Sequence, residues 1–382
     1  MNLFGRFFLV FASAAISGCS WLAPEEPVQP VSPLEQITAP VQGQLLWSRD
    51  IGGDTEFDTL RPSLENGRIL IASEKGVVAS VDAVTGSLAW QQDIDARISG
   101  GVGAGMGLAL VGTPEGVLVA LDQQTGAERW RQSLTSALIA APAAGQGIVV
   151  ARTNDGKIVG LSAADGSPVW TFEREVPVLS LRGESSPVVA GTQVLCGLDV
   201  GKVVALDIST GRPDWEATVA YPTGRSDLDR VVDIDGDPLV AGDAVFVTSY
   251  QGYMTAISRS TGGAGWSIPF SSYTGLAADS RTLYASDDRG YLWAIDPSTG
   301  NVLWTQKALS GRRLSMPAAT GGWAAVGDLE GYLHWIEPET GEIRGRTRAT
   351  GSEISQRILA SGNVVYVTDI EGELVAVRAP SR

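Results

Sequence analysis

The residues with side chains suited to catalysis or metal binding are few in this chain. It has one histidine, His334, and two cysteines, Cys19 and Cys196. A zinc site of the usual kind needs several such ligands, and a Ser/His or Cys/His pair needs a histidine beside its nucleophile. The thiol of Cys196 is either a reactive group or a small buried apolar residue. These residue types therefore give little support to zinc or nucleophilic chemistry.

A second candidate is an acidic stretch with aspartates at Asp227, Asp229, Asp233, Asp235 and Asp237. Within it, "DIDGDP" resembles the start of an EF-hand loop. Its glycine comes fourth instead of sixth, however, and Ala244 occupies the place of the closing glutamate. We therefore expect no calcium site here. The aspartates are either solvated turn formers or part of a surface for a partner.

The N-terminus predicts export and lipid attachment. Residues 1–18 hold Arg6 and then an apolar stretch too short for a stable membrane span, which is typical of a signal peptide. The ending "ISGC" resembles a bacterial lipobox, in which Cys19 is diacylated. The alternative is an ordinary export signal cleaved near Ala15. Ser20 indicates the outer membrane, because an inner-membrane retention signal usually has Asp at that position.

Composition narrows the function further. Residues 19–43 are rich in proline and predict an extended, unfolded tether between Cys19 and the folded domain. The formal net charge is -15, and no run of basic residues interrupts it. Nucleic-acid binding needs a positive patch, so this class of function is set aside. We expect a domain that faces the periplasm from a lipid anchor.

The remainder of the chain is built from copies of one unit. A glycine followed by alternating apolar residues recurs at positions 76, 116, 156, 201, 252, 290, 331 and 372, about forty residues apart. A D-x-x-T-G-type segment follows most copies and ends in a tryptophan on the next strand. The repeated tryptophans are Trp47, Trp90, Trp130, Trp170, Trp215, Trp266 and Trp304. Self-similarity at this period indicates a solenoid, a propeller or an array.

The pattern inside each unit selects the propeller. Apolar residues alternate with a period of two between turn residues, which predicts strands and excludes helical repeats. Four strands cannot bury both faces alone, so each sheet must stack on the next. We predict an all-β, eight-bladed β-propeller of four-stranded antiparallel blades over residues 44–378, with a tail at 379–382. The strand around Trp47 should pair with the C-terminal blade and close the ring, which removes an open edge.

Aligning the copies of the repeat predicts the environment of single residues. Cys196 falls in a column of Ile, Val and Ala, and His334 in one of mostly Val and Ala, so both are expected to be packed strand residues. Trp335 stands where other copies have Ala, and its unit has Gly345 in place of the outer tryptophan. A local repacking of that blade would explain both departures.

Two neighbouring connections between units are the longest, those after Trp170 and Trp215. In an up-and-down blade, such links leave on the face opposite the T-G turns, so both should lie side by side there. The first offers Leu179, Leu181 and Arg182, and the second the acidic stretch. Loops held by a rigid scaffold often carry function. The alternative is that the leucines are buried and the aspartates are solvated.

With the lipobox, the tether and the repeats together, the chain resembles the BamB family, the lipoprotein propellers of the outer-membrane β-barrel assembly machinery. The stretches "LSLRGESSP" and "VDIDGDP" carry the specific part of this resemblance. It implies a non-enzymatic scaffold without a cofactor, which binds the periplasmic POTRA domains of BamA and assists folding and insertion of outer-membrane proteins. It also implies contacts through Leu179, Leu181, Arg182, Asp233 and Asp235. Val232 and the Gly-Asp-Pro ending depart from the family pattern. These departures lie in the stretch that carries the contact implied for Asp233 and Asp235.

Two other classes stay open. Dehydrogenases that use pyrroloquinoline quinone share the tryptophan repeat, but they have adjacent cysteines over the cofactor, carboxylate and Asn ligands for calcium, and long insertions. This chain has no Cys-Cys pair. A periplasmic propeller that binds glycans or peptides is the third class. Blade edges could also pair with strands of unfolded outer-membrane clients, although no edge is marked as open.

Overall fold

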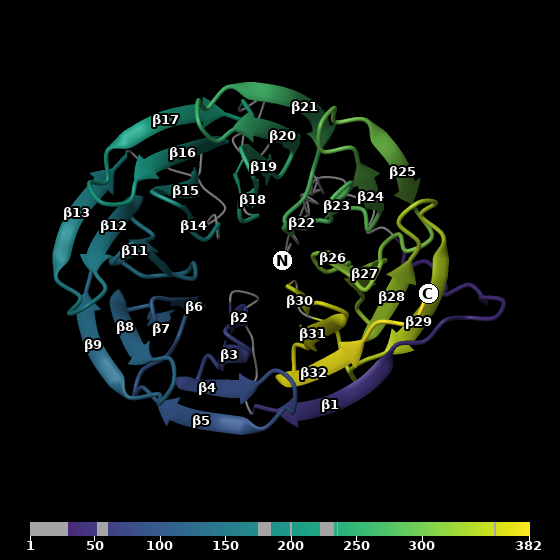
Figure 1. Ribbon diagram of the computed structural model, residues 1–382, viewed down its shortest axis with the longest axis horizontal. Coiled ribbons are helices and arrows are strands. Elements are labelled where there is room, and N and C mark those ends of the chain that lie inside the picture. The colour runs from purple at the N-terminus through teal and green to yellow at the C-terminus, as the bar shows by residue number, and fades with distance from the viewer. Residues whose placement is uncertain are drawn as a thin grey trace, which may run out of the picture.

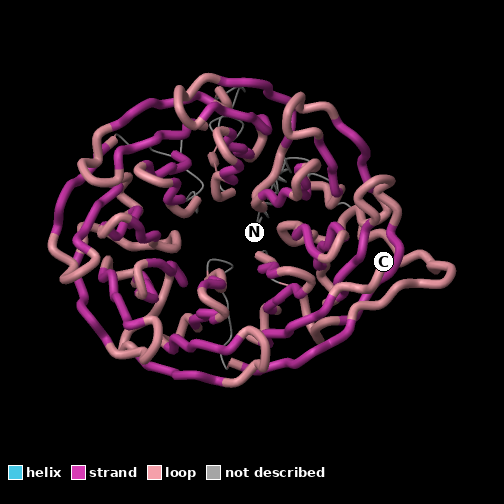
Figure 2. The backbone as a smooth tube through the Cα atoms, viewed as in Figure 1, coloured by secondary structure: helices cyan, strands magenta, loops and turns pink. Residues whose placement is uncertain are grey.

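Eight four-stranded sheets surround a central axis (Figure 1). The computed structural model describes residues 30–51, 60–174, 185–198, 201–221, 233–234, 236–354 and 357–382. Within these ranges all regular structure is β-strand, as Figure 2 shows along the backbone. This confirms the predicted all-β, eight-bladed propeller. No helix in the described part of the chain has the length and apolarity needed to cross a membrane.

The first four blades follow one another along the chain, each running from its innermost to its outermost strand. Blade one is β2 (Ser63–Glu65), β3 (Arg68–Ala72), β4 (Val77–Asp82) and β5 (Leu88–Asp93). Blade two is β6 (Gly100–Gly105), β7 (Leu108–Gly112), β8 (Val117–Asp122) and β9 (Glu128–Ser133). Blade three is β10 (Ala143–Gly145), β11 (Ile148–Arg152), β12 (Lys157–Ser162) and β13 (Pro168–Glu173). Blade four is β14 (Val188–Ala190), β15 (Gln193–Leu198), β16 (Lys202–Asp207) and β17 (Pro213–Thr218).

The remaining blades repeat this order, and the last one borrows its outermost strand from the N-terminus. Blade five is β18 (Leu239–Ala241), β19 (Ala244–Thr248), β20 (Gly252–Ser258) and β21 (Ala264–Phe270). Blade six is β22 (Leu276–Ala278), β23 (Leu283–Ser286), β24 (Leu292–Ile295) and β25 (Val302–Gln306). Blade seven is β26 (Ala318–Thr320), β27 (Trp323–Gly327), β28 (Tyr332–Ile336) and β29 (Ile343–Arg348). Blade eight is β30 (Leu359–Ser361), β31 (Val364–Thr368), β32 (Glu373–Arg378) and β1 (Gln44–Asp50).

The hydrophobic core is divided among the interfaces between neighbouring blades. In the interface of blades one and two, Leu70 and Val78 pack with Val111 and Val119, and all four are fully buried. The two middle strands of each blade are covered on both faces, which explains their nearly continuous apolar runs. The outermost strands are much more exposed, and in β5 and β9 only the tryptophan is buried. Each blade therefore depends on its neighbours for burial.

The propeller has two different faces. On one face, which we call the connection face, lie the hairpins with the repeat glycines and the links between blades; Ile94 N donates to Gly76 O there, at 3.0 Å. The opposite face, which we call the T-G face, carries the D-x-x-T-G turns beside the first hairpin of each blade; Ala83 N donates to Gly67 O at 3.0 Å. The described ends of the links from one blade to the next therefore lie on the connection face.

Each outer-strand tryptophan docks onto the T-G turn of the next blade. Trp90 Nε1 donates a 2.9 Å hydrogen bond to the carbonyl of Gln123. Gly126 has a φ of +75°, and a Cβ built there would come within 2.6 Å of the Trp90 ring, so both conformation and space require glycine. The same indole-to-carbonyl bond joins Trp47 to Ala83, Trp130 to Ala163, Trp170 to Ile208, Trp215 to Arg259, Trp266 to Pro297 and Trp304 to Pro338.

The ring closes through the N-terminal strand, as predicted. β1 pairs antiparallel with β32, with Trp47 opposite Ala376. Trp47 then docks onto blade one, where a Cβ built on Gly86 would lie 2.5 Å from its ring. β1 thus joins the last blade to the first and covers the edge that β32 would otherwise expose.

Blade seven replaces the missing tryptophan with the N-terminal segment, which projects beside β29 in Figure 1. Val41 N donates to Arg344 O at 3.0 Å, and a Cβ built on Gly345 would lie 1.8 Å from Val41 O. Trp335 is fully buried beneath this segment, and its Nε1 donates to Thr347 Oγ1 at 2.9 Å. The glycine and the inner tryptophan are therefore two parts of one local repacking.

The same segment is held at a second point. Ser32 N donates to Ser310 O at 2.9 Å, and the buried Arg312 donates from Nη1 to Ser32 O at 3.0 Å. Arg312 is in turn paired with Asp328 and Glu330. Residues 19–43 are predicted as an unfolded tether, but the described part, 30–43, lies against blade seven instead.

Candidate partner-binding face

The predicted site residues divide between described and undescribed parts of the chain. Cys19, Leu179, Leu181, Arg182 and Asp235 lie outside the described residues. Asp233 is described, and so are all seven repeat tryptophans, which lie on the outermost strands of their blades.

The two long connections flank blade four. One joins β13 to β14, and the other joins β17 to β18. Their described ends lie on the connection face, where the outermost strand of one blade passes to the innermost strand of the next. A direct contact joins them, because Ser186 N, behind the first connection, donates to Asp237 Oδ1, at the end of the second, at 2.8 Å.

The end of the second connection is anchored in the core. Ile234 is fully buried in the cluster between blades four and five, together with Val203 and Val245. A Cβ built on Gly197 would lie 2.7 Å from Ile234 Cγ2, so glycine at this position allows the close approach. Asp233 is only 1% exposed, and Tyr250 N donates to its carbonyl oxygen at 3.0 Å. In this conformation Asp233 holds the connection in place, and its carboxylate does not face solvent.

A partly buried charge cluster lies where the two connections meet. Asp237 Oδ1 lies 3.3 Å from Arg61 Nη1, and Asp237 Oδ2 lies 2.7 Å from Arg357 Nη1. Burial acts to raise the pKa of the Asp237 carboxyl, but Arg61, Arg357 and the amide of Ser186 outweigh it and hold that pKa below its usual value. The carboxylate is therefore ionised at neutral pH.

The cluster borders a pocket of about 440 Å³ at the mouth of the central channel. Its wall combines the two arginines with apolar side chains of the innermost strands, among them Val102, Val189 and Leu359. Sequence reasoning did not identify Arg61 and Arg357. Both stand just before an innermost strand, a position that the repeat alignment could have assigned to the channel mouth.

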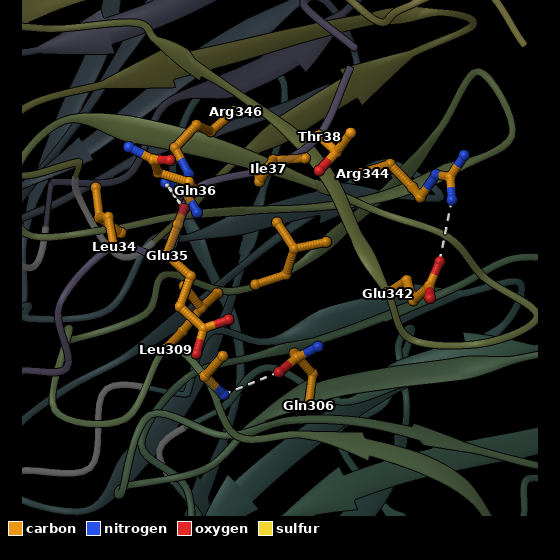
Figure 3. Close-up of a pocket in the computed structure, with 12 residues that line it drawn as sticks. Leu34, Glu35, Gln36, Ile37, Thr38, Gln306, Leu309, Glu342, Arg344 and Arg346 are labelled. Carbon is orange, nitrogen blue, oxygen red and sulfur yellow. Dashed lines mark hydrogen bonds and ion pairs between the residues drawn. The ribbon is translucent and has the colours of Figure 1, made fainter. Parts of the chain in front are cut away.

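A second pocket, of about 370 Å³, lies between the N-terminal segment and blades six and seven (Figure 3). Its two arginines are already engaged: Arg344 Nη1 lies 3.0 Å from Glu342, and Arg346 Nη1 donates to Glu35 O at 2.8 Å. Figure 3 shows Leu34, Glu35 and Ile37 of the segment forming one wall. This pocket is a seam between the segment and the ring, away from the long connections.

The two residues with reactive side chains are packed in the interior, as predicted. Cys196 on β15 is fully buried, and burial raises the pKa of its thiol to about 12. His334 on β28 is fully buried with Nε2 at 2.8 Å from Asp328 Oδ2, and burial lowers its pKa in spite of that carboxylate. Within the described ranges, no group of three or more His, Cys, Asp or Glu residues is placed to hold a metal ion.

Comparison with known proteins matches this architecture to one family. A family model described as "Outer membrane protein assembly factor BamB" matches residues 35–100, 74–306 and 302–381. The protein of that name from Pseudomonas aeruginosa is 49% identical over 325 residues, which cover 84% of this chain and 85% of the relative.

Two solved structures have the same propeller fold. The crystal structure of BamB from Moraxella catarrhalis superposes with a TM-score of 0.80 at 30% identity, covering 88% of this chain and 99% of that one. A quinohemoprotein alcohol dehydrogenase from Comamonas testosteroni reaches a TM-score of 0.70 at 15% identity, covering 89% and 77%. The second likeness shows a shared propeller fold alone. The chain belongs to the BamB family of outer membrane protein assembly factors.

Proposed function

We propose that this protein is a non-enzymatic scaffold lipoprotein of the β-barrel assembly machinery, which binds the periplasmic POTRA domains of BamA through its connection face. The observation that carries the proposal is the joining of the two long connections at Asp237 beside blade four. Membership of a family named for outer-membrane protein assembly supports the role and a non-enzymatic assignment. By this binding the protein would assist folding and insertion of outer-membrane proteins.

Each residue has a distinct part in the proposal. Leu179 and Leu181 would supply apolar burial, each worth roughly 1.5–3 kcal/mol if fully covered. Arg182 would pair with a carboxylate of the partner, and Asp235 with a basic residue. Asp233 is buried in the free protein and would support the acidic contact from beneath. Loss of one member of a buried interfacial charge pair costs about 2–5 kcal/mol, because the other charge is left unpaired.

The test is binding to a periplasmic fragment of BamA, measured by calorimetry and by co-purification. Leu181→Glu should abolish binding, because it places a charge in an apolar contact, and Arg182→Ala should weaken it greatly. Glu128→Ala is the control: Glu128 is exposed at the start of β9, near the T-G face, and forms a surface ion pair with Arg131. Exposed pairs contribute less than about 1 kcal/mol, so binding should be unchanged.

The proposal is wrong if folded Leu181→Glu and Arg182→Ala proteins retain wild-type affinity. Circular dichroism of each variant separates a lost contact from a lost fold. A loss of binding that appears only together with unfolding would also count against a direct contact.

We also propose that Cys19 is the lipid attachment site, which would hold the domain at the outer membrane on the periplasmic side. The supporting observation is the lipobox that ends at this cysteine. Cys19→Ala should leave the precursor unprocessed or release a soluble protein. Mass spectrometry that finds an unmodified Cys19 on the mature wild-type protein would contradict the assignment.

A further inference from the structure

Asp237 is the meeting point of parts of the chain that are distant in sequence. It precedes Pro238 and β18, so it ends the connection between blades four and five. Its Oδ1 accepts a 2.8 Å hydrogen bond from the amide of Ser186, which stands just before β14 at the end of the other long connection. One carboxylate therefore joins the ends of both connections.

The two arginines tie this junction to the far side of the ring. Arg61 precedes β2 of blade one, and Arg357 precedes β30 of blade eight. Blade one lies opposite blade five across the central axis (Figure 1). Because Arg61 Nη1 is 3.3 Å and Arg357 Nη1 2.7 Å from the carboxylate, the cluster spans the channel mouth and connects four blades.

Partial burial strengthens the ion pairs and the hydrogen bond of the Asp237 carboxylate. The side chains of Asp237, Arg61 and Arg357 are 17%, 12% and 33% exposed, so the pair with Arg61 is shielded from water and salt more than the pair with Arg357. Removing the carboxylate leaves two guanidinium groups close together without the charge between them. Asparagine at this position offers one acceptor oxygen in place of two, so its NH2 group must face a donor, either Ser186 N or Arg357 Nη1, and an unmade buried hydrogen bond is costly.

We propose that Asp237 is a positioning residue for partner binding, which clamps the ends of the two long connections together through Ser186, Arg61 and Arg357. The inference rests on the proposed function, because it concerns affinity for the BamA fragment. It assigns Asp237 no contact with the partner. It predicts instead that residues brought by both connections reach the partner together only when this carboxylate is present.

The test uses Asp237→Asn in the full-length protein, with Asp243→Asn as the matched control. Asp243 is in the same blade but on the T-G face, where its carboxylate accepts hydrogen bonds from Ser258 and Ser260. Asp237→Asn should lower affinity for the BamA fragment about tenfold, with an unchanged circular dichroism spectrum. Asp243→Asn should bind like the wild type.

Two further readouts distinguish positioning from a general loss of stability. Hydrogen exchange at the amide of Ser186 should become faster in Asp237→Asn, while amides of the T-G turns stay protected. In a double-mutant cycle with Arg182→Ala, the two losses of affinity should be less than additive, because a misplaced connection has already lost part of the Arg182 contact. A merely structural role predicts additive losses.

The results distinguish failure of the clamp from failure of the proposed function. If Leu181→Glu loses binding but folded Asp237→Asn binds like the wild type, the clamp is wrong and the proposed function stands. If Leu181→Glu binds like the wild type, the proposed function is wrong, and this inference with it. If Asp237→Asn fails to fold, Arg357→Gln decides: weaker binding by the folded variant supports the clamp, and wild-type affinity overturns it.

Discussion

The T-G face and the connection face are built from the same repeats. The T-G face keeps the repeated contacts, whereas the connection face departs from them beside blade four. On the T-G face, seven tryptophans make one kind of bond to the next blade, and a glycine covers each ring. On the connection face, the links beside blade four are longer in sequence than the others, and their described ends meet at a partly buried aspartate that pairs with two arginines. The repeated contacts hold the ring together, and we propose that the departures from the repeat form the partner surface.

In blade seven the N-terminal segment takes the place of the missing tryptophan. There the N-terminal segment packs at Gly345 and covers Trp335. Blade seven thus agrees with the other blades, because another part of the chain restores the contact that the missing tryptophan would have made. Changes to the T-G face should therefore affect stability, and changes to the long connections should affect binding.

The largest effect on stability is expected from Trp215→Ala. The ring docks between blades four and five and donates to Arg259 O at 2.7 Å. Removing a buried tryptophan costs about 3–5 kcal/mol. Chemical denaturation should show this loss, while protein that is still folded binds the BamA fragment with wild-type affinity. Normal stability together with lost binding would reverse the roles assigned to the two faces.

A smaller effect is expected from a matched pair of glycine substitutions in blade five. Gly262 and Gly242 both have positive φ, +73° and +63°. A Cβ at Gly262 would lie 2.8 Å from the Trp215 ring, whereas a Cβ at Gly242 meets nothing within 4 Å. Both alanine variants carry backbone strain of about 1–2 kcal/mol, and Gly262→Ala should lose about 1–3 kcal/mol more through overpacking. Equal unfolding midpoints would show that docking tolerates a side chain at this turn.

The smallest effect is expected from acid acting on the T-G turns. Hydrogen bonds from Arg129 and then from Thr125 lower the pKa of Asp122 to about 2. Because the folded pKa lies below the unfolded value of about 3.9, this carboxylate stabilises the fold above pH 4 and loses that contribution as the pH falls toward 2. The difference in unfolding free energy between the wild type and Asp122→Asn should therefore shrink over this range. A difference independent of pH would contradict the assignment.

The sequence was sufficient to predict the ring, because each blade repeats contacts between near neighbours. The T-G turns, the docking tryptophans and closure through Trp47 all follow from columns of the alignment. The unusual pair of Trp335 and Gly345 identified the altered blade without showing what fills it.

Contacts between distant parts of the chain could not be predicted in this way. Arg61, Arg357 and Asp237 each stand two residues before an innermost strand, but the repeat does not indicate which blades contact one another across the ring. The docking of residues 30–43 depends on hydrogen bonds to Ser310, Arg312, Arg344 and Arg346, which proline-rich composition does not indicate. The burial of Asp233 follows from Ile234 entering the core beside it.

The most direct test of the central claim is hydrogen exchange of the whole protein with and without the periplasmic fragment of BamA. We predict that binding slows exchange in the two connections, at 174–187 and 221–239, and leaves the T-G turns unchanged, such as those at 83–87 and 123–127. Protection of the T-G turns, with no change in the two connections, would contradict the account.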